Sequence, residues 1–300
     1  MNQLQVKAHA KINLALDIIN KRSDGYHNLR SPMQSLLLHD TIVLEKTAGG
    51  AIALECDNPR IPKGMANLAC KAAEKMMNAY YIGSGLRINL RKMVPAAAGL
   101  GGGSSNAAAV LRGINELFCV GASNAELAAI GKSIGADVPF CVYGGTMLAE
   151  GIGDVLTPLP PHPRISVVLA KPPVEVSTQQ VYTTFSQMRV AAGSRPDISA
   201  ILHGLEASDL REISRGISSG VANMLESVTA AAHPIITELK VAFLRNGAEC
   251  ALMSGSGPTV FAYFKDDDRA AAAARNIRNE MPRINDIFVT STYNEAVIPG

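Results

Sequence analysis

The stretch PAAAGLGGGSSNAAAVL, residues 95–111, places four glycines within positions 99–103 and then begins a helical pattern. Glycine is unfavourable inside regular structure, and a run of it allows the backbone to come close to another group. Residues 86–94 before the run alternate as a strand, and residues 106–118 after it carry apolar side chains at helical spacing. A strand, a glycine loop and a helix start are what an anion site needs, because loop N–H groups and the helix dipole both favour phosphate.

The loop matches neither of two common nucleotide motifs. No Gly-Lys-Ser/Thr follows the glycines, so it is not a Walker A sequence, and Ser104 stands where a dinucleotide fingerprint needs glycine. Ser104 and Ser105 add hydroxyl donors, and either could ligate Mg²⁺. The structural alternative is a tight turn with serine as the helix N-cap. The density of glycines favours phosphate binding over that alternative.

A second glycine loop, SGSGP at residues 254–258, lies between expected strands at 249–253 and 259–264. Alone it is typical of an ordinary hairpin connection. Taken with the first loop it indicates a candidate ligand site, because two segments that line phosphates could enclose one nucleotide.

Two charged residues occupy apolar surroundings. Lys11 lies inside an expected strand over residues 4–18. Asp137 follows a helical pattern at 124–133 and precedes an apolar run, in a segment (135–154) that is expected to be a loop and then strands. Each has an ordinary explanation, a lysine that points to solvent and an aspartate in a turn or cap. Near a phosphate loop, however, they are what phosphoryl transfer to an alcohol uses. The carboxylate accepts or orients the hydroxyl proton, and the ammonium offsets developing charge.

Composition narrows the class of protein. The chain has 300 residues, is 47% hydrophobic and carries a net charge of +2, which gives no global case for nucleic acid or an anionic membrane. No apolar stretch reaches the roughly 18 residues that span a bilayer. The N-terminus alternates like a strand and has no signal-peptide core, so we expect a cytoplasmic protein. The five cysteines are scattered among apolar neighbours and favour reduced core thiols.

A proline-rich connector divides the chain. Prolines at positions 158, 160, 161 and 163 precede an expected strand at 165–173 and predict a boundary between residues 1–163 and 164–300. After the second glycine loop, an expected helix at 267–280 and a strand at 286–293 complete a βαβ-like block. The pattern predicts a small α+β second domain.

Five segments together resemble a known family. The first glycine stretch resembles the P-x-x-x-G-L-G-S-S-A phosphate loop of the galactokinase–homoserine kinase–mevalonate kinase–phosphomevalonate kinase (GHMP) superfamily. With the other four segments, the triple-glycine version resembles the branch that acts on a cytidine diphosphate-linked methylerythritol in non-mevalonate isoprenoid biosynthesis. Those segments, in chain order, are AHAKINLALDI (8–18), RSDGYHNL (22–29), GADVPFCVYGGTMLAEGIGD (135–154) and ALMSGSGPTVFAYF (251–264).

The resemblance implies a fold and a reaction. The fold is α+β, with a ribosomal-S5-domain-2-like N-terminal domain, a ferredoxin-like C-terminal domain and the site between them. The first domain binds ATP and carries the catalytic groups, and the second binds the substrate. ATP with Mg²⁺ phosphorylates the 2-hydroxyl of the methylerythritol part. Lys11 and Asp137 fall on the catalytic pair, with Asp137 as base and Lys11 as electrostatic partner. The resemblance further implies small-molecule substrates only and a monomer or weak homodimer.

The resemblance also implies binding residues. Asn13 contacts the substrate alcohol, Tyr26 and Tyr182 hold cytosine between two rings, and His27 hydrogen-bonds the base edge. Tyr182 is expected on a strand and loop after the domain junction. Asn106 is expected to cap the helix after the glycine loop. Ser105 is expected nearest Mg²⁺, and Asn67 and Lys92 on the adenosine side. The residues expected to bind ATP are Pro95, Gly99, Leu100, Gly101, Gly102, Gly103, Ser104, Ser105, Asn67 and Lys92.

Two rival functions remain open at this stage. The first is another GHMP kinase, acting on homoserine or mevalonate; DGYHNL (24–29) and Tyr182 argue against it, since they make sense if a planar base is held. The second is a catalytically silent sugar- or nucleotide-binding regulator on the same fold. Loss of Lys11 or Asp137 would mark such a regulator, but both residues are present.

Overall fold

The glycine loop joins strand β5 (Gly85–Arg91) to helix α2 (Gly102–Leu117) in the computed structural model, which describes residues 1–188 and 195–294. The helix begins at Gly102, earlier than the expected start at Asn106, and its N-cap Gly101 has a left-handed φ of 68°. Ser104 and Ser105 therefore lie in the first turn of α2. The expected capping role of Asn106 is wrong, because this residue lies inside the helix.

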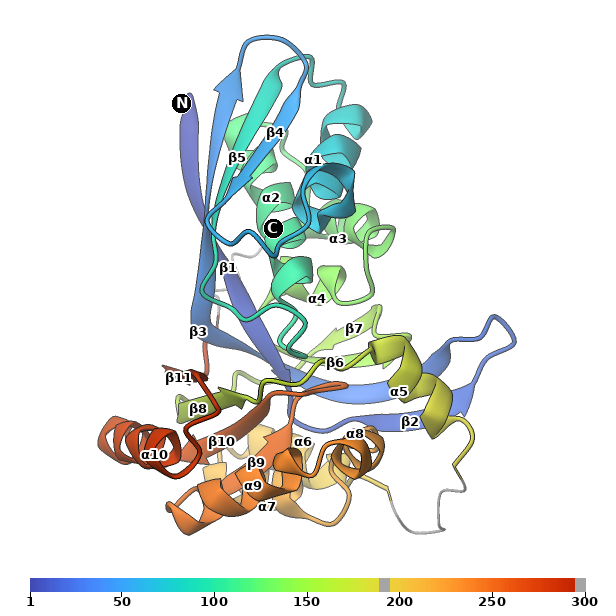
Figure 1. Ribbon diagram of the computed structural model, residues 1–300. Helices are drawn as coiled ribbons and strands as arrows, with labels where there is room; N and C mark the ends of the chain where they lie inside the picture. The colour runs from blue at the N-terminus through green and yellow to red at the C-terminus, as the bar shows by residue number, and fades with distance from the viewer. Residues whose placement is uncertain (189–194, 295–300) are drawn as a thin grey trace.

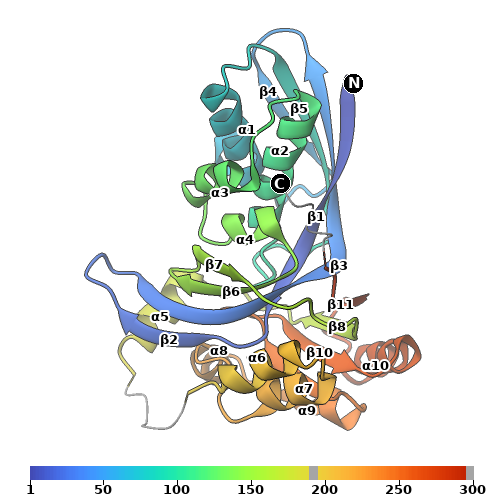
Figure 2. The ribbon, with the colours of Figure 1, turned by 180° about the vertical axis from the view of Figure 1, so that it is seen from behind.

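The first sheet is built around one long strand. β3 (His27–Thr47) has 21 residues and pairs with β1, β2, β5 and β6 along different parts of its length. Figure 1 and Figure 2 show α1 to α4 together on one side of this sheet. The other strands are β1 (Gln3–Asn13), β2 (Asp17–Lys21), β4 (Ile52–Cys56), β6 (Thr146–Gly151) and β7 (Val155–Pro158). The helices beside α2 are α1 (Leu68–Ala79), α3 (Asn124–Lys132) and α4 (Val138–Tyr143), with a short 3₁₀ turn at Gly64–Ala66.

The second sheet has four antiparallel strands in the order β11-β8-β10-β9. Helix α10 leads from β10 to β11 and β8 lies between these two strands, so the expected βαβ-like block and the ferredoxin-like order are both present. The strands are β8 (Ser166–Lys171), β9 (Cys250–Met253), β10 (Val260–Phe264) and β11 (Asp286–Ser291). The helices are α5 (Thr178–Phe185), α6 (Ile198–Glu206), α7 (Leu210–Ser218), α8 (Glu226–Ala232), α9 (Ile235–Arg245) and α10 (Asp267–Glu280).

Strand β1 links the two sheets through its side-chain alternation. Ala10, Ile12 and Leu14 are fully buried in one core with residues of β8 and β10 from the second sheet. Because successive side chains of a strand point to opposite faces, Lys11 and Asn13 point the other way, into the space between the two parts. Along the chain, all strands of the first sheet precede residue 163 and all strands of the second follow residue 164. The domain boundary at this point stays a prediction.

Two local expectations are wrong. Tyr182 lies on helix α5 rather than on a strand and loop; Ser177 caps this helix by accepting from Gln180 N, and Val181 and Phe185 bury its inner face. The segment after Asp137, expected as a loop, forms the short helix α4 with a proline in its first turn. Proline is tolerated there because the first helical N–H groups have no partner within the helix. Across the described ranges 1–188 and 195–294, no helix is both long and apolar enough to cross a membrane.

Candidate active site

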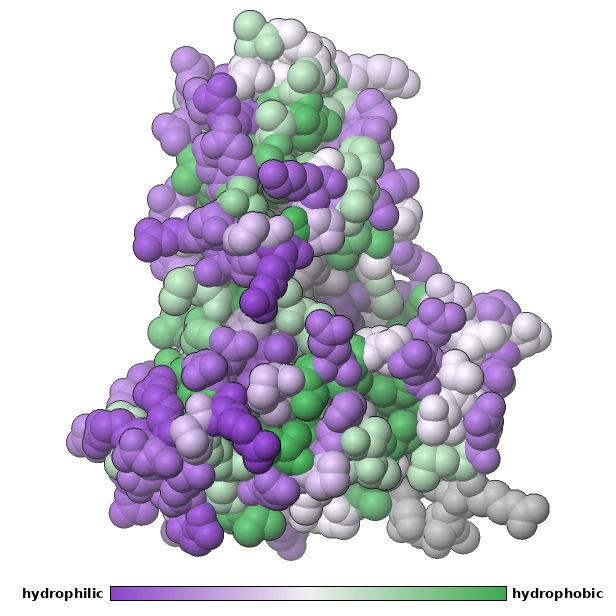
Figure 3. Space-filling model, viewed as in Figure 1, coloured by the Kyte–Doolittle hydropathy of each residue, from purple (hydrophilic) through white to green (hydrophobic). Residues whose placement is uncertain are grey.

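A cavity of about 1070 Å³ lies between the two parts of the molecule. Figure 3 shows the surface hollowed between the upper and lower parts on this face. Its walls come from β1, the first glycine loop, the start of α4, the β2–β3 hairpin, α5 and the second glycine loop. The expected site residues that line it are Lys11, Asn13, Tyr26, His27, Gly99, Gly101, Gly102, Gly103, Ser104, Asp137 and Tyr182.

Lys11 and Asp137 form an ion pair inside this cavity. Lys11 Nζ lies 3.3 Å from Asp137 Oδ2, and the side chains are 6% and 36% exposed. Lys11 Nζ also donates to Asn13 Oδ1 at 2.8 Å. Asn13 is held in turn, since its Nδ2 donates to Ser31 Oγ at 2.8 Å, and Ser31 Oγ donates to the Ala15 carbonyl at 2.6 Å. The ammonium is thus fixed in direction, while the carboxylate stays open to a group that enters the cavity.

An irregularity in β1 directs Lys11 under the glycine loop. The pairing of β1 with β3 shifts register between His9 and Lys11. Lys11 N instead donates to the Leu100 carbonyl at 3.0 Å, which ties the strand to the loop. A Cβ at Gly101 would lie 2.9 Å from Lys11 Cγ, so this glycine leaves the room that the lysine side chain occupies. A lysine from the neighbouring strand thus lies beside a loop that, unlike a Walker loop, carries no lysine of its own.

The two glycine loops touch each other. Gly99 has a φ of +74°, and a Cβ there would lie 2.3 Å from the Ser254 carbonyl oxygen. Ser254 Oγ donates to the Gly99 carbonyl at 2.9 Å. At the start of α2 the backbone N–H groups of Gly102, Gly103 and Ser104 have no acceptor within the helix, and all three residues line the cavity. This arrangement can accept the phosphates of a nucleotide.

Two residues that sequence reasoning missed hold the second loop in place. Asn223, which is buried, donates through Nδ2 to the carbonyls of Met253 and Gly255, each at 2.8 Å. Thr178 Oγ1 lies 2.8 Å from Ser256 Oγ and joins this loop to the N-terminus of α5. Neither belongs to a motif, so no signal in the sequence marks them. Gly255, Ser256 and Thr178 all line the cavity.

The far wall of the cavity carries an aromatic and histidine group. His27 is buried, and its Nε2 lies 2.7 Å from Ser186 Oγ. Because Ser186 Oγ donates to the Tyr182 carbonyl, His27 Nε2 is the donor to Ser186 and Nδ1 is left as an acceptor. The rings of His27 and Tyr182 have centroids 5.3 Å apart, and Tyr26 is 61% exposed at the cavity edge.

Electrostatics keep both rings of this wall neutral near pH 7. Burial, and next the positive charge of Lys21, lower the pKa of His27 below its ordinary value of 6.5. Burial, and next the negative charge of Asp137, raise the pKa of the Tyr182 hydroxyl. A neutral imidazole with a free acceptor nitrogen suits an amino group on a base edge.

The structure does not bring five of the expected nucleotide residues to the cavity wall: Pro95, Leu100, Ser105, Asn67 and Lys92. Ser105 is buried, and its hydroxyl donates to the His9 carbonyl at 2.6 Å, so Ser104 is the serine that faces the cavity. Asn67 caps α1 by accepting from Ala69 N at 2.9 Å. These residues shape the loop and the helices around it, and their roles in nucleotide binding stay predictions.

Lys92 lies in a buried polar group that sequence reasoning missed. It pairs with the fully buried Asp40, and Asn106 Nδ2 donates to the same carboxylate at 2.8 Å. Asp40 Oδ1 also accepts from the backbone N–H groups of Met93 and Val94 at 2.7 and 2.8 Å. The carboxylate therefore anchors the chain where it enters the glycine loop. The available signal was an aspartate within the apolar run LLLHDTIVL (36–44).

No cluster of three or more His, Cys, Asp or Glu side chains that could hold a metal occurs within residues 1–188 and 195–294. Mg²⁺ does not require one, because it is commonly bound by one or two carboxylates together with substrate phosphates and water. The Ser104 hydroxyl is a cavity group that fits this use, whereas Asp137 is paired with Lys11 and Asp24 with Arg22, at 3.3 and 2.8 Å.

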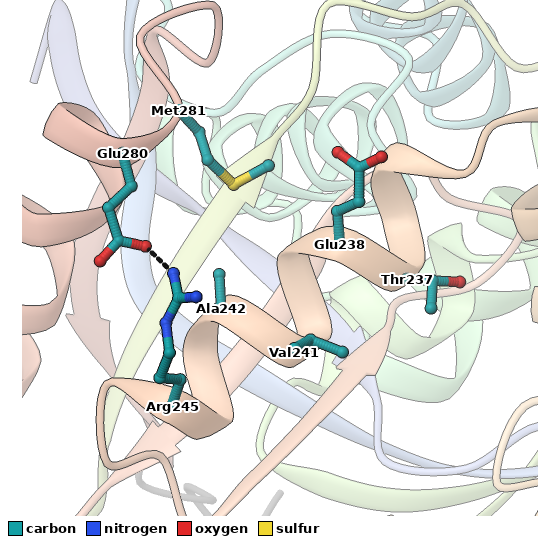
Figure 4. Close-up of a pocket in the computed structure, with 7 residues that line it drawn as sticks. All are labelled: Thr237, Glu238, Val241, Ala242, Arg245, Glu280 and Met281. Carbon is teal, nitrogen blue, oxygen red and sulfur yellow. Dashed lines mark hydrogen bonds and ion pairs between the residues drawn. The ribbon is translucent and has the colours of Figure 1, made fainter.

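A second hollow, of about 380 Å³, lies between α9 and α10 (Figure 4). An ion pair between Arg245 and Glu280 crosses it, and Val241 and Met281 contribute apolar surface. It contains none of the residues that the sequence marks for chemistry. The large cavity between the two parts is therefore the candidate active site.

Comparison with known proteins agrees with this geometry. Residues 67–145 match the family model described as GHMP kinases N terminal domain, and residues 201–283 match GHMP kinases C terminal. The homoserine kinase from Cytophaga hutchinsonii, 20% identical, shares the fold with a TM-score of 0.78 over 98% of this chain and 95% of that one. By its fold and its site, the chain is a kinase of the GHMP class.

More similar proteins narrow the family. The 4-diphosphocytidyl-2-C-methyl-D-erythritol kinase of Acetivibrio thermocellus is 46% identical over 292 residues, which cover 97% of this chain and 100% of the relative. That of Geobacillus kaustophilus is 44% identical, covering 92% and 93%. A crystal structure of 4-(cytidine 5'-diphospho)-2C-methyl-D-erythritol kinase, 32% identical, has a TM-score of 0.80 and covers 97% and 100%. The chain belongs to the 4-diphosphocytidyl-2-C-methyl-D-erythritol kinase family.

Proposed function

We propose that this protein transfers the γ-phosphoryl group of ATP to the 2-hydroxyl of 4-diphosphocytidyl-2-C-methyl-D-erythritol, giving the 2-phosphate and ADP. The observation that carries the proposal is the 3.3 Å pair of Lys11 and Asp137. It lies in one cavity with the glycine loop on one wall and His27 and Tyr182 on another. The family membership supports the same substrate.

The phosphates of ATP bind at the start of α2. The N–H groups of Gly102, Gly103 and Ser104 face them, and the positive end of the helix dipole favours their charge. Mg²⁺ would neutralise part of the charge of the phosphates. The Ser104 hydroxyl would supply a protein ligand to it, with the other ligands coming from the phosphates and water.

The reacting hydroxyl lies against Asp137. Its carboxylate accepts or orients the hydroxyl proton as the oxygen attacks the γ-phosphorus, and the bond to the β-phosphate oxygen breaks. The Lys11 ammonium, held by Asn13 at 2.8 Å, offsets the negative charge that develops on the transferred group. In this position Asn13 is also within reach of the alcohol.

The cytosine ring lies between Tyr26 and Tyr182. His27 Nδ1 accepts from the exocyclic amino group, which distinguishes cytosine from a base that presents a carbonyl there. Homoserine and mevalonate carry no planar base that this wall could bind. A cytoplasmic location and a monomeric or weakly dimeric state stay predictions.

Steady-state phosphorylation of the cytidyl substrate, mevalonate and homoserine tests the proposal. We expect turnover of the cytidyl substrate; turnover of mevalonate or homoserine instead would refute it. Asp137→Asn should lower kcat by about 10²- to 10⁴-fold while ATP and substrate still bind. The control is Asp268→Asn, which removes one exposed carboxylate from α10. Normal turnover in Asp137→Asn would remove Asp137 from the role of base, and no turnover of any alcohol by the unaltered enzyme would favour the silent regulator.

A further inference from the structure

The charged residues of the cavity wall are almost all paired. Two lysines and two aspartates line the cavity, Lys11 with Lys21 and Asp24 with Asp137. Lys11 is paired with Asp137 and Asp24 with Arg22, at 3.3 and 2.8 Å. Within residues 1–188 and 195–294, no ion pair is recorded for Lys21. This lysine is therefore a cation of the wall that remains available to an anionic ligand.

The register of the β2–β3 hairpin sets the place of Lys21. Its partner across the two antiparallel strands is His27. Side chains of directly paired residues lie on the same face of a sheet, so Lys21 lies beside the histidine that faces Tyr182. The electrostatic effect of Lys21 on His27 agrees with this proximity. Figure 1 shows the hairpin extending beside α5, away from the loop that precedes α2.

That position separates Lys21 from the phosphates of ATP. A substrate with its base between Tyr26 and Tyr182 and its acceptor hydroxyl at Asp137 must span the cavity between these two points. The diphosphate that joins the nucleoside to the sugar alcohol occupies the intervening stretch. It brings negative charge to a wall where Lys11 is already engaged.

We propose that Lys21 binds the diphosphate bridge of the alcohol substrate and thereby selects a cytidine diphosphate conjugate over an uncharged cytidine conjugate. The proposal rests on the proposed function, because it takes the base site and the acceptor site from it. It adds a specificity-determining residue on the wall beside the base site, whose charge acts on the bridge. An ammonium group on an exposed, flexible stem suits a mobile diphosphate, which has no fixed bidentate geometry.

Calorimetric binding of cytidine 5'-diphosphate and of cytidine tests the proposal without turnover. In Lys21→Gln we expect the affinity for the diphosphate to fall about tenfold, as for one charge-assisted contact at a solvated site, with cytidine affinity unchanged. Lys21→Arg should restore most of the loss. Lys75→Gln removes one exposed charge from α1 and is the control for net charge.

The outcomes are separable from those of the kinase assay. Equal losses for cytidine and its diphosphate, or no loss for either, would overturn the assignment. So would a Lys21→Gln variant whose KM for ATP rises while diphosphate binding is unchanged, since Lys21 would then serve ATP. One further outcome is that the unaltered protein phosphorylates no cytidyl substrate, while Lys21→Gln still loses the preference for cytidine 5'-diphosphate over cytidine. In that case the proposed reaction would be refuted and the assignment of Lys21 to the diphosphate would stand.

Discussion

Replacement of Gly99 by alanine tests whether contact between the two glycine loops sets the geometry of the site. The change adds a Cβ at a φ of +74°, only 2.3 Å from the Ser254 carbonyl oxygen. The left-handed backbone alone costs an L-residue about 1–2 kcal/mol. To reach ordinary van der Waals separation, one loop must also move by about 1 Å, and overpacking of this kind costs about 1–3 kcal/mol.

Gly121→Ala is the matched control, because Gly121 has a φ of +79° and nothing within 4 Å of an added Cβ. Both variants carry the cost of an L-residue in the left-handed region, so the difference between their free energies of unfolding isolates the steric clash. In a urea titration we expect the free energy of unfolding of Gly99→Ala to be about 1–3 kcal/mol lower than that of Gly121→Ala. Its kcat/KM should fall by about 10²-fold, the usual effect of a 1 Å misplacement at reacting groups. If the two variants matched in stability and in kcat/KM, the loop contact would have no part in positioning the phosphates.

Three further predictions concern His162, Asp40 and Thr178. Burial lowers the pKa of His162 to about 4, so the unfolded chain binds a proton near pH 6.5 that the folded protein does not. The stabilisation is complete above pH 6.5 and falls by about 3 kcal/mol toward pH 4, and urea titrations of His162→Gln should lose this part of the pH dependence. Asp40→Asn leaves Lys92 buried without its carboxylate and should cost about 3–5 kcal/mol of unfolding free energy, whereas an unchanged urea midpoint would contradict the anchoring role. Thr178→Val removes the 2.8 Å bond to Ser256 and should lower the free energy of unfolding by about 0.5–1.5 kcal/mol; an unchanged urea midpoint would count against a role of this bond in holding the second loop.

The elements with strong local signals follow the sequence closely. Helix α10 has the expected bounds Asp267–Glu280, because Asp266 caps it and alanines repeat along its buried face. The start of α2 was misplaced because glycine weakens a helical pattern in sequence, although Gly101 in the left-handed region begins the helix here. Helix α5 was missed because the signal for it is short. Its buried positions are only two, Val181 and Phe185.

The proximity of Lys11 and Asp137 could be predicted because both residues stand within segments that resemble the family, and their catalytic roles stay predictions. Residues that act through hydrogen bonds across the fold could not be predicted in the same way. Asn223 lies 30 and 32 positions from the carbonyls it holds, and Asp40 lies more than 50 positions from the backbone N–H groups of Met93 and Val94. Such contacts depend on the tertiary arrangement alone. A polar residue of this kind is evident from sequence only when an apolar run surrounds it, as for Asp40.

The glycine loop needs no lysine of its own, because the lysine beside it comes from another strand. In a loop that carries its own lysine, that residue must both fit the start of the helix and place its ammonium near the phosphate. Here Gly101 needs no side chain, since Lys11 occupies the room that a Cβ at this position would take. The register shift in β1 frees Lys11 N to bond with Leu100, so loop and lysine are fixed to each other by backbone rather than by a shared helix. In the proposed function, catalytic charge and phosphate binding therefore come from separate elements. Substitutions at Lys11 should therefore impair phosphoryl transfer more than they weaken ATP binding.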